Sequence, residues 1–167
     1  MYSRICIFGR PGSGKSTFSN RLHHKTALPL YHLDAYFFIA NWMERDYQEF
    51  LTLQQHIVDQ EKWIIDGNCI KSLAMRYARA DLCIYFNYPR WLCLLRMIKR
   101  VYWKNNISND IADGCKRNVT WKLIVYMWTF EKRINQRIAK LQATYPQTRY
   151  IEVQNRNDLK KVLKLLI

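Results

Sequence analysis

The stretch "IFGRPGSGKST", residues 7–17, decides the fold that we predict for this chain. It overlaps a short apolar run, "RICIFG" at residues 4–9, whose β-branched and aromatic side chains are typical of a buried strand. It leads into "KSTFSNRLHHKT", residues 15–26, which we predict to be a helix. A glycine-rich turn between a buried strand and a helix is therefore expected at this point.

Four residues of this turn follow the pattern G-x-x-x-x-G-K-[ST], namely Gly9, Gly14, Lys15 and Ser16. Glycines let the backbone amides turn inward around phosphate groups, and the start of a helix adds a partial positive charge. Lys15 would reach the β- and γ-phosphates of a nucleotide, and Ser16 would bind Mg²⁺. A plain glycine-rich turn is the alternative. We expect ATP or GTP to bind, with Mg²⁺, through Gly9, Pro11, Gly12, Ser13, Gly14, Lys15, Ser16 and Thr17.

Strands alternate with helices along the rest of the chain, which predicts a parallel α/β sheet. Further strands are expected at residues 28–34, 62–67, 82–86 and 149–153. Helices are expected at residues 46–61, from Pro89 to about Trp103, from about Val119 to Ala143, and at residues 157–166 with Asn157 as a cap. Turn formers interrupt this pattern at residues 105–114, "NNISNDIADG". We therefore predict a single domain, residues 1–167, with a mobile lid at about residues 103–118.

Two aspartates follow predicted strands, and ligands collect at the carboxyl ends of the strands in an open parallel sheet. Asp66 ends the apolar strand in "WIIDG", where a protein with a phosphate-binding loop needs an acidic residue for its metal. Asp34 ends "YHLD" and would orient or deprotonate the hydroxyl group of an acceptor. The alternatives are a turn residue at Asp66 and a helix cap or turn residue at Asp34. Together with the loop, the two carboxylates predict phosphoryl transfer.

The net charge of +14 is unevenly distributed along the chain. Residues 1–88 contain ten Lys and Arg against eight Asp and Glu, whereas residues 89–167 contain seventeen against five, a net charge of +12. Such asymmetry suggests a polyanionic partner, for which DNA is one candidate. Solvated helix faces and nucleotide phosphates would account for the same charge, so these alternatives stay open.

Composition also indicates the compartment that we expect. The five cysteines are odd in number and form no C-x-x-C pair, which favours reduced thiols in a cytosolic protein. No apolar run reaches the ~18 residues that a membrane-spanning helix needs. We therefore expect a cytoplasmic protein with no membrane partner.

Four stretches together resemble the P-loop family called DNA topology modulation, or FlaR-like, proteins: "GRPGSGKST", "HLDAYF", "WIIDGN" and "YFNYPRWLCLLRMIKR". That family is similar to the adenylate- and shikimate-kinase-like proteins, and the resemblance covers nearly the whole chain. It implies a three-layer α/β P-loop NTPase fold with a five-stranded parallel sheet and a helical lid insertion. It also implies binding of ATP or GTP and kinase-type chemistry.

The same resemblance implies roles for two arginines and an asparagine. In adenylate-kinase-like proteins a proline after the fourth strand precedes two lid arginines, and Arg96 and Arg100 stand at the matching offsets from Pro89. They would stack on the base and hold the phosphates, for which a planar guanidinium is suited. Two solvated arginines on a basic helix are the alternative. By analogy with the same fold, Asn155 lies in a loop that contacts adenine.

Two departures from the related families concern the acceptor and the lid. The segment that carries a phosphate-binding arginine in adenylate kinases is here "DGNCI", so we do not expect AMP to be recognised as it is there. Arg76 is a candidate substitute for that arginine. The family pattern of Pro-Glu-Arg after the cysteine that matches Cys115 is here "CKRN", which puts the lid chemistry in doubt.

We therefore predict a small P-loop kinase that transfers the γ-phosphoryl group of ATP or GTP to a nucleoside, a nucleotide or a hydroxyl metabolite. The predicted catalytic residues are Lys15, Asp34, Arg96 and Arg100, and the predicted metal ligands are Ser16 and Asp66. The alternative is a nucleotide-switched DNA-binding protein that uses residues 89–167, although no helix-turn-helix or zinc finger supports it. The sequence leaves the acceptor, the base preference and the oligomeric state open.

Overall fold

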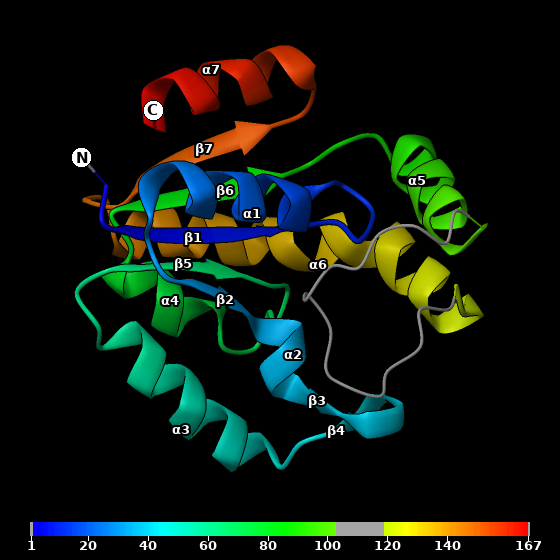
Figure 1. Ribbon diagram of the computed structural model, residues 1–167, viewed down its shortest axis with the longest axis horizontal. Helices are drawn as coiled ribbons and strands as arrows, with labels where there is room; N and C mark the ends of the chain where they lie inside the picture. Colours follow the sequence, from blue (N-terminus) through cyan, green and yellow to red (C-terminus); the bar gives the residue numbers. More distant parts are fainter. Residues whose placement is uncertain (1, 103–118, 167) are drawn as a thin grey trace.

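The computed structural model describes residues 2–102 and 119–166, and it contains the five-stranded parallel sheet that the sequence predicts (Figure 1). The strand order is β2-β5-β1-β6-β7, with β1 in the centre. All ladders between neighbouring strands of this sheet are parallel, so the strands end at one common edge. The strands are β1 (Arg4–Gly9), β2 (Leu30–His32), β5 (Trp63–Asp66), β6 (Leu82–Phe86) and β7 (Arg149–Val153).

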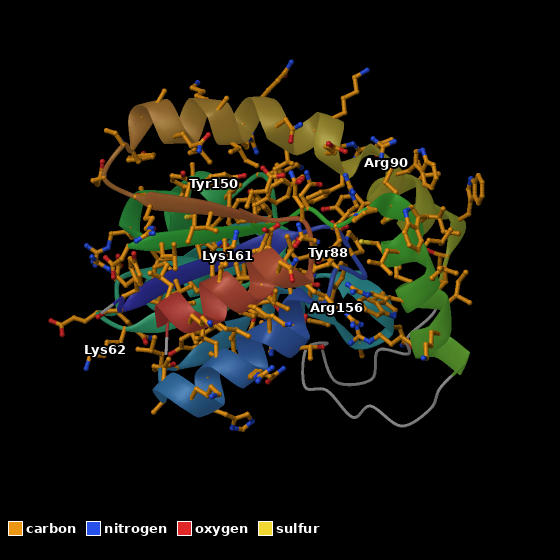
Figure 2. The ribbon with its side chains drawn as sticks, turned by 90° about the horizontal axis from the view of Figure 1, so that it is seen from above. Lys62, Tyr88, Arg90, Tyr150, Arg156 and Lys161 are labelled. Atoms are coloured by element: carbon orange, nitrogen blue, oxygen red, sulfur yellow. The ribbon has the colours of Figure 1, made fainter. Side chains whose placement is uncertain are left out.

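Helices cover both faces of the sheet, because successive residues of a strand point to opposite faces. Ile5 and Ile7 of β1 pack in one apolar cluster with α1 and α7, whereas Cys6 and Phe8 pack in a second cluster with α3, α4 and α6. Figures 1 and 2 show α6 on the opposite side of the sheet from α1 and α7, which confirms the three-layer α/β architecture. These helices are α1 (Lys15–Thr26), α3 (Tyr47–Val58), α4 (Leu73–Arg79), α6 (Trp121–Thr144) and α7 (Arg156–Leu166).

Further elements lie near the edge where the strands end. They are α5 (Arg90–Tyr102), α2 (Leu33–Phe37), the 3-10 helix η1 (Ala40–Trp42), and a hairpin of β3 (Phe38–Ile39) and β4 (Met43–Glu44). The sequence pattern does not predict α2, α4 or the hairpin. The predicted lid at residues 103–118 lies outside the described residues. None of the described helices combines the length and the apolar character needed to cross a membrane.

The second strand is shorter than the sequence predicts, because β2 ends at His32 and Asp34 lies in the first turn of α2. β2 is an edge strand paired with β5, and β5 ends at Asp66, the ladder partner of His32. The ladder between β2 and β5 ends at the pair of His32 and Asp66, and the chain continues from there into α2. The start of that helix favours a carboxylate. The prediction that Asp34 ends a strand is therefore wrong.

The cap of the last helix also differs from the prediction. The side-chain oxygen of Asn155 accepts hydrogen bonds from the N–H groups of Asn157 and Asp158, at 2.8 and 3.1 Å. Asn155 therefore caps α7, and the prediction of Asn157 as the cap is wrong. Both asparagines suit a cap by residue type. Because β7 ends at Val153 and α7 starts at Arg156, Asn155 is the asparagine that directly precedes the helix.

The first strand is anchored by Asp81, which immediately precedes β6. Its Oδ2 accepts the N–H groups of Ser3 and Arg4 at 3.0 and 2.9 Å, and its Oδ1 lies 2.7 Å from Nη2 of Arg4. Burial alone would raise the pKa of Asp81, but the hydrogen bonds from Arg4 and Ser3 outweigh it and lower the pKa. The ionised carboxylate therefore stabilises the folded state.

We expect Asp81→Asn to lower the free energy of unfolding by about 1–2 kcal/mol at neutral pH, because the ionised acceptor of these hydrogen bonds is lost. The contribution of the ionised Asp81 to the free energy of unfolding is complete above the unfolded-state pKa of about 3.9. It disappears as the pH falls through the lower pKa that Asp81 has in the folded state. Urea unfolding of both proteins across this range measures it. Glu61→Gln, which removes an exposed carboxylate, is the control. A difference between wild type and Asp81→Asn that does not change with pH would contradict this account.

Candidate active site

The loop after β1 is held by hydrogen bonds to segments on both sides of it. The N–H of Gly9 donates to Oδ1 of Asn68, which follows β5, at 3.0 Å. The N–H of Arg10 donates to the carbonyl oxygen of Phe86, the last residue of β6, at 3.2 Å. The φ angle of Gly9 is +151°, and a Cβ at this position would collide with the same Phe86 carbonyl group. The loop therefore starts from a fixed position at the carboxyl ends of the strands.

Helix α5 lies directly on this loop. Gly12 has a φ angle of +77°, and a Cβ on it would collide with the carbonyl oxygen of Cys93 in α5. From the same helix, Nη1 of Arg96 donates to the carbonyl oxygen of Ser13 at 2.9 Å. The guanidinium group of Arg96 lies 4.7 Å from the centre of the Tyr88 ring. The structure thus brings Arg96, one of the two arginines predicted to contact the nucleotide, against the loop.

Lys15 is the first residue of α1 and is 9% exposed. Within the described part of the chain, its ammonium group makes no hydrogen bond or ion pair, and the hydroxyl group of Ser13 is buried without a partner. Ser16 and Thr17 lie in the first turn of α1, where N–H groups have no partners within the helix. A buried cation beside such N–H groups is complementary to a phosphate chain. These residues therefore fit the phosphate groups of a nucleotide.

Asp66, the predicted metal ligand, lies beside the loop because its ladder partner on β1 is Ile7. Its Oδ2 lies 3.0 Å from Nδ1 of His32, and both side chains are buried. Its Oδ1 is buried and has no hydrogen-bond partner among the residues that the structure describes. His32 therefore fixes one oxygen of the carboxylate and leaves the other available to a ligand. Sequence pattern alone does not identify His32, because only strand pairing brings it to Asp66.

The residues present fit Mg²⁺ only together with a nucleotide. Mg²⁺ usually keeps several waters and takes one or two protein oxygens in addition to substrate phosphates. Ser16, in the first turn of α1, and Asp66, the last residue of β5, offer oxygens of this kind. Across residues 2–102 and 119–166, no group of three or more His, Cys, Asp or Glu side chains could hold a metal ion by itself.

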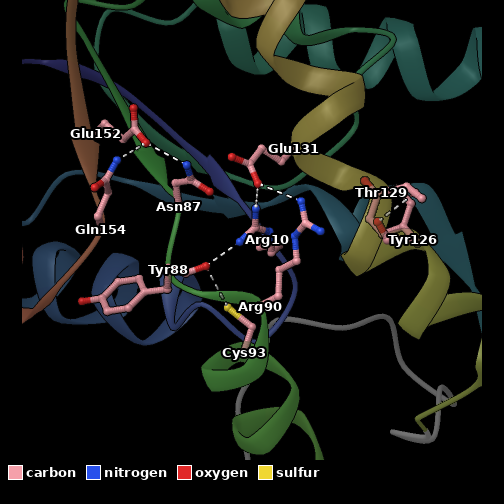
Figure 3. A network of polar contacts seen from close by, with 10 residues as sticks. All are labelled: Arg10, Asn87, Tyr88, Arg90, Cys93, Tyr126, Thr129, Glu131, Glu152 and Gln154. Atoms are coloured by element: carbon pink, nitrogen blue, oxygen red, sulfur yellow. Dashed lines mark hydrogen bonds and ion pairs between the residues drawn. The ribbon is translucent and has the colours of Figure 1, made fainter.

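Arg10, the second residue of the loop, ties it to α6 (Figure 3). Arg10 is 2% exposed, its Nη1 donates to the carbonyl oxygen of Tyr88 at 2.5 Å, and its Nη2 lies 2.6 Å from Oε2 of Glu131. The same carboxylate oxygen lies 3.3 Å from Nη2 of Arg90, the first residue of α5. The sequence gives no indication of this contact, because Arg10 and Glu131 are 121 positions apart. A cavity of about 480 Å³ beside this network is lined by Arg10, Asn87, Pro89, Arg90, Glu131, Gln154 and Asn155.

Asp34, which is partly buried, influences the side chain of Tyr126 in α6. Burial raises the pKa of Tyr126, and the negative charge of Asp34 raises it further. The guanidinium group of Arg133, also in α6, lies 5.9 Å from the centre of the Tyr126 ring. Tyr126 thus lies within electrostatic reach of the carboxylate that we predict to orient the acceptor, and Arg133 lies beside Tyr126. No motif marks them, because α6 reaches Asp34 only through the fold.

The structure also shows where three further residues from the sequence analysis lie. Arg100 is exposed on α5, about one turn after Arg96. Asn155 caps α7 and lines the cavity, and its contact with adenine stays a prediction. Arg76 is fully buried and donates to the carbonyl oxygens of Gly67 and Cys69, so it holds the loop after β5. The suggestion that Arg76 replaces a phosphate-binding arginine is therefore wrong.

No protein-family model and no curated protein sequence matches this chain. Solved structures do match it over nearly its whole length. Shikimate kinase from Acinetobacter baumannii, in complex with shikimate, has a TM-score of 0.62 at 14% identity and covers 98% of this chain and 92% of that chain. Shikimate kinase from Bacteroides thetaiotaomicron has a TM-score of 0.58 at 16% identity, with 99% of each chain covered. Deoxyadenosine kinase from M. mycoides with bound dATP has a TM-score of 0.54 at 12% identity, with 98% of each chain covered.

These likenesses, together with the loop and the sheet, show that the chain has a P-loop kinase fold of the kind found in shikimate and deoxyadenosine kinases. The resemblance to the DNA topology modulation family finds no support among them.

We expect Lys15→Ala to weaken binding of a nucleoside triphosphate by about 2–3 kcal/mol, because one charge-assisted contact to the phosphates is lost. Titration calorimetry with a non-hydrolysable ATP analogue and Mg²⁺ measures the affinity. Lys25→Ala, in the last turn of the same helix, removes an equal charge at an exposed position and should leave the affinity unchanged. Equal affinities for Lys15→Ala and wild type would show that the loop does not bind phosphate through this residue.

We expect Glu131→Gln to lower the free energy of unfolding by about 2 kcal/mol, because the buried Arg10 loses its counter-charge. Arg90→Gln is the matched control, since it removes the more exposed cation from the same carboxylate and should cost less than about 1 kcal/mol. Urea unfolding of the three proteins compares them. Equal losses in the two variants would contradict the assignment of Arg10 as the main partner of Glu131.

Proposed function

We propose that this protein is a small kinase that transfers the γ-phosphoryl group of ATP or GTP to a hydroxyl group of a small acceptor. The observation that carries the proposal is the pairing of two features at one edge of the sheet. Lys15 is a buried cation in the loop, and Asp66 presents a buried carboxylate oxygen without a partner among the described residues. A cation for phosphate and a carboxylate for the metal are the two requirements of phosphoryl transfer in P-loop proteins.

In this proposal the residues around the loop have separate roles in the reaction. The loop N–H groups and Lys15 bind the phosphates and stabilise the negative charge that develops on the diphosphate as it leaves. Mg²⁺, when bound, neutralises charge on the phosphates. His32 holds Asp66 in position through its 3.0 Å contact, and Oδ1, which has no partner among the described residues, would hold the metal or its water. In this proposal Arg96, which contacts the carbonyl oxygen of Ser13, also contacts the transferred group.

The acceptor would bind between α2 and α6, where Asp34 lies near Tyr126. In this proposal the carboxylate of Asp34 accepts the proton of the acceptor hydroxyl group as the new oxygen–phosphorus bond forms. In this proposal the hydroxyl group of Tyr126 and the guanidinium group of Arg133 contact the rest of the acceptor. One similar structure is a shikimate kinase in complex with shikimate and another is a deoxyadenosine kinase, which supports a small hydroxyl compound or a nucleoside as the acceptor.

A nucleotide-switched DNA-binding protein is the alternative function, and the net charge of +12 on residues 89–167 favours it. Two of the basic residues in this part are already used near the loop, because Arg90 binds Glu131 and Arg96 binds Ser13. Exposed cations on solvated helix faces do not by themselves require nucleic acid.

Incubation with ATP, Mg²⁺ and a panel of nucleosides, nucleotides and small hydroxyl metabolites tests the proposal through the release of ADP. We expect release that depends on one acceptor class. Asp34→Asn should lower that turnover by about 100-fold while triphosphate affinity is retained, because a general base is lost. Asp66→Asn should weaken the Mg²⁺ dependence of nucleotide binding.

Asp59→Asn, which changes an exposed aspartate after α3, is the control for both variants. Full turnover of Asp34→Asn with every accepted substrate would remove Asp34 from the mechanism. Nucleotide binding without any acceptor-dependent ADP release across the panel would favour the alternative function.

A further inference from the structure

Among the side chains that the structure describes, six large apolar ones are exposed on α5 and on the first two turns of α6. On α5 they recur at positions 91, 95 and 98, and on α6 they recur at positions 121, 125 and 128, so each set forms one helical stripe. Trp91 is 62% exposed and Trp121 is 75% exposed. We call this surface the tryptophan face, and it consists of Trp91, Leu95, Ile98, Trp121, Val125 and Trp128.

The two stripes lie on neighbouring helices and point away from the body of the protein. Arg90 of α5 contacts α6 twice, through an ion pair with Glu131 and through its guanidinium group 5.6 Å from the centre of the Trp128 ring. Figure 2 labels Arg90 at this junction, and Figure 1 also places α5 beside the start of α6. The opposite sides of the helices are buried, as Cys93 on α5 and Met127 on α6 show. The tryptophan face therefore consists of two exposed stripes on helices that contact each other through Arg90.

Both helices that carry this face are strongly basic. α5 contains four Lys or Arg and no acidic residue, and α6 contains five Lys or Arg with Glu131 as its one acidic residue. Lys122 and Lys132 are exposed on the same helix as Trp121 and Trp128. An apolar surface bordered by cations is complementary to a partner that is both apolar and negatively charged.

We propose that the tryptophan face docks on the surface of an anionic lipid membrane. Tryptophan is favoured at the boundary between lipid headgroups and hydrocarbon, where an indole ring can be partly buried with its N–H group in water. Aliphatic side chains such as Leu95 and Val125 enter the acyl boundary, and the neighbouring cations contact anionic headgroups. The sequence expectation of no membrane partner rested on the lack of a spanning segment, and docking of this kind needs none.

Other partners use only part of this surface. A second copy of the chain would place two strongly basic helix pairs against each other, which opposes association through like charge. A nucleic acid would use the cations, and a single strand would also use the tryptophan rings for stacking. It would leave Leu95, Ile98 and Val125 in water. A lipid surface is the partner that accommodates the whole face together with its charge.

Co-sedimentation with two kinds of vesicle tests the proposal, one of phosphatidylcholine alone and one of phosphatidylcholine with phosphatidylglycerol. We expect binding to the second kind with a blue shift of tryptophan fluorescence. The double variant Trp91→Ser and Trp121→Ser should weaken binding by about tenfold or more, since two large apolar side chains no longer enter the lipid. Leu95→Ser with Val125→Ser is a second pair that should act in the same direction.

Met43→Ser is the control, because Met43 is 59% exposed in the β3–β4 hairpin, outside the tryptophan face. Lys122→Glu with Lys132→Glu should also weaken binding, and it leaves the arginines of the proposed active site in place. All variants should retain the unfolding temperature and the ATP affinity of wild type, which separates this test from that of the proposed kinase function.

Several outcomes would overturn the proposal. The first is binding to anionic vesicles that the serine variants do not weaken, because charge alone would then explain it. The second is the lack of binding to either kind of vesicle. A dimer in sedimentation equilibrium that the serine variants dissociate would assign the face to a second copy. Tighter binding to DNA than to vesicles, weakened by the same variants, would assign it to nucleic acid.

Discussion

The register of the parallel ladder between β1 and β5 is the constraint on which the proposed site depends. It pairs Ile7 with Asp66, and the next ladder pairs Asp66 with His32. Asp66 shares its face of the sheet with Ile64, on the side of α1, whereas Ile65 belongs to the opposite cluster. A slip of one residue would turn the carboxylate into that apolar cluster, where an unpaired charge is very costly. Register therefore decides whether the acid and the loop can act together.

Two helices extend this arrangement beyond the sheet. Helix α6 reaches the loop through Glu131 and the proposed acceptor side through Tyr126, so one rigid element contacts both halves of the site. Helix α5 has two different sides. Cys93 and Arg96 lie against the loop, and Trp91 lies on the exposed tryptophan face. A membrane bound at that face would therefore leave the loop side of α5 unchanged.

Local features of the sequence determined the class of fold and the centre of the proposed site. The loop from Gly9 to Thr17 is defined by a short pattern in which each residue type has a direct physical role. The strands β1, β5 and β6 follow from buried apolar runs, and the alternation of strands with helices along the chain predicts parallel pairing. Asp66 was predictable because its position at the end of such a run places it at the edge where ligands collect. Each of these inferences needs only residues close together in the chain.

Only the tertiary structure decided the contacts between distant residues. His32 meets Asp66 through strand pairing, and Arg10 meets Glu131 because α6 crosses the sheet to the loop. The pairing of β2 with β5 also ended the second strand before Asp34. Helix α5 has apolar residues around much of its circumference, so periodicity does not tell which of them are buried. The loop occupies one side of that helix, and Trp91 is left largely exposed because the part of the chain that the structure describes puts no further layer on the opposite side.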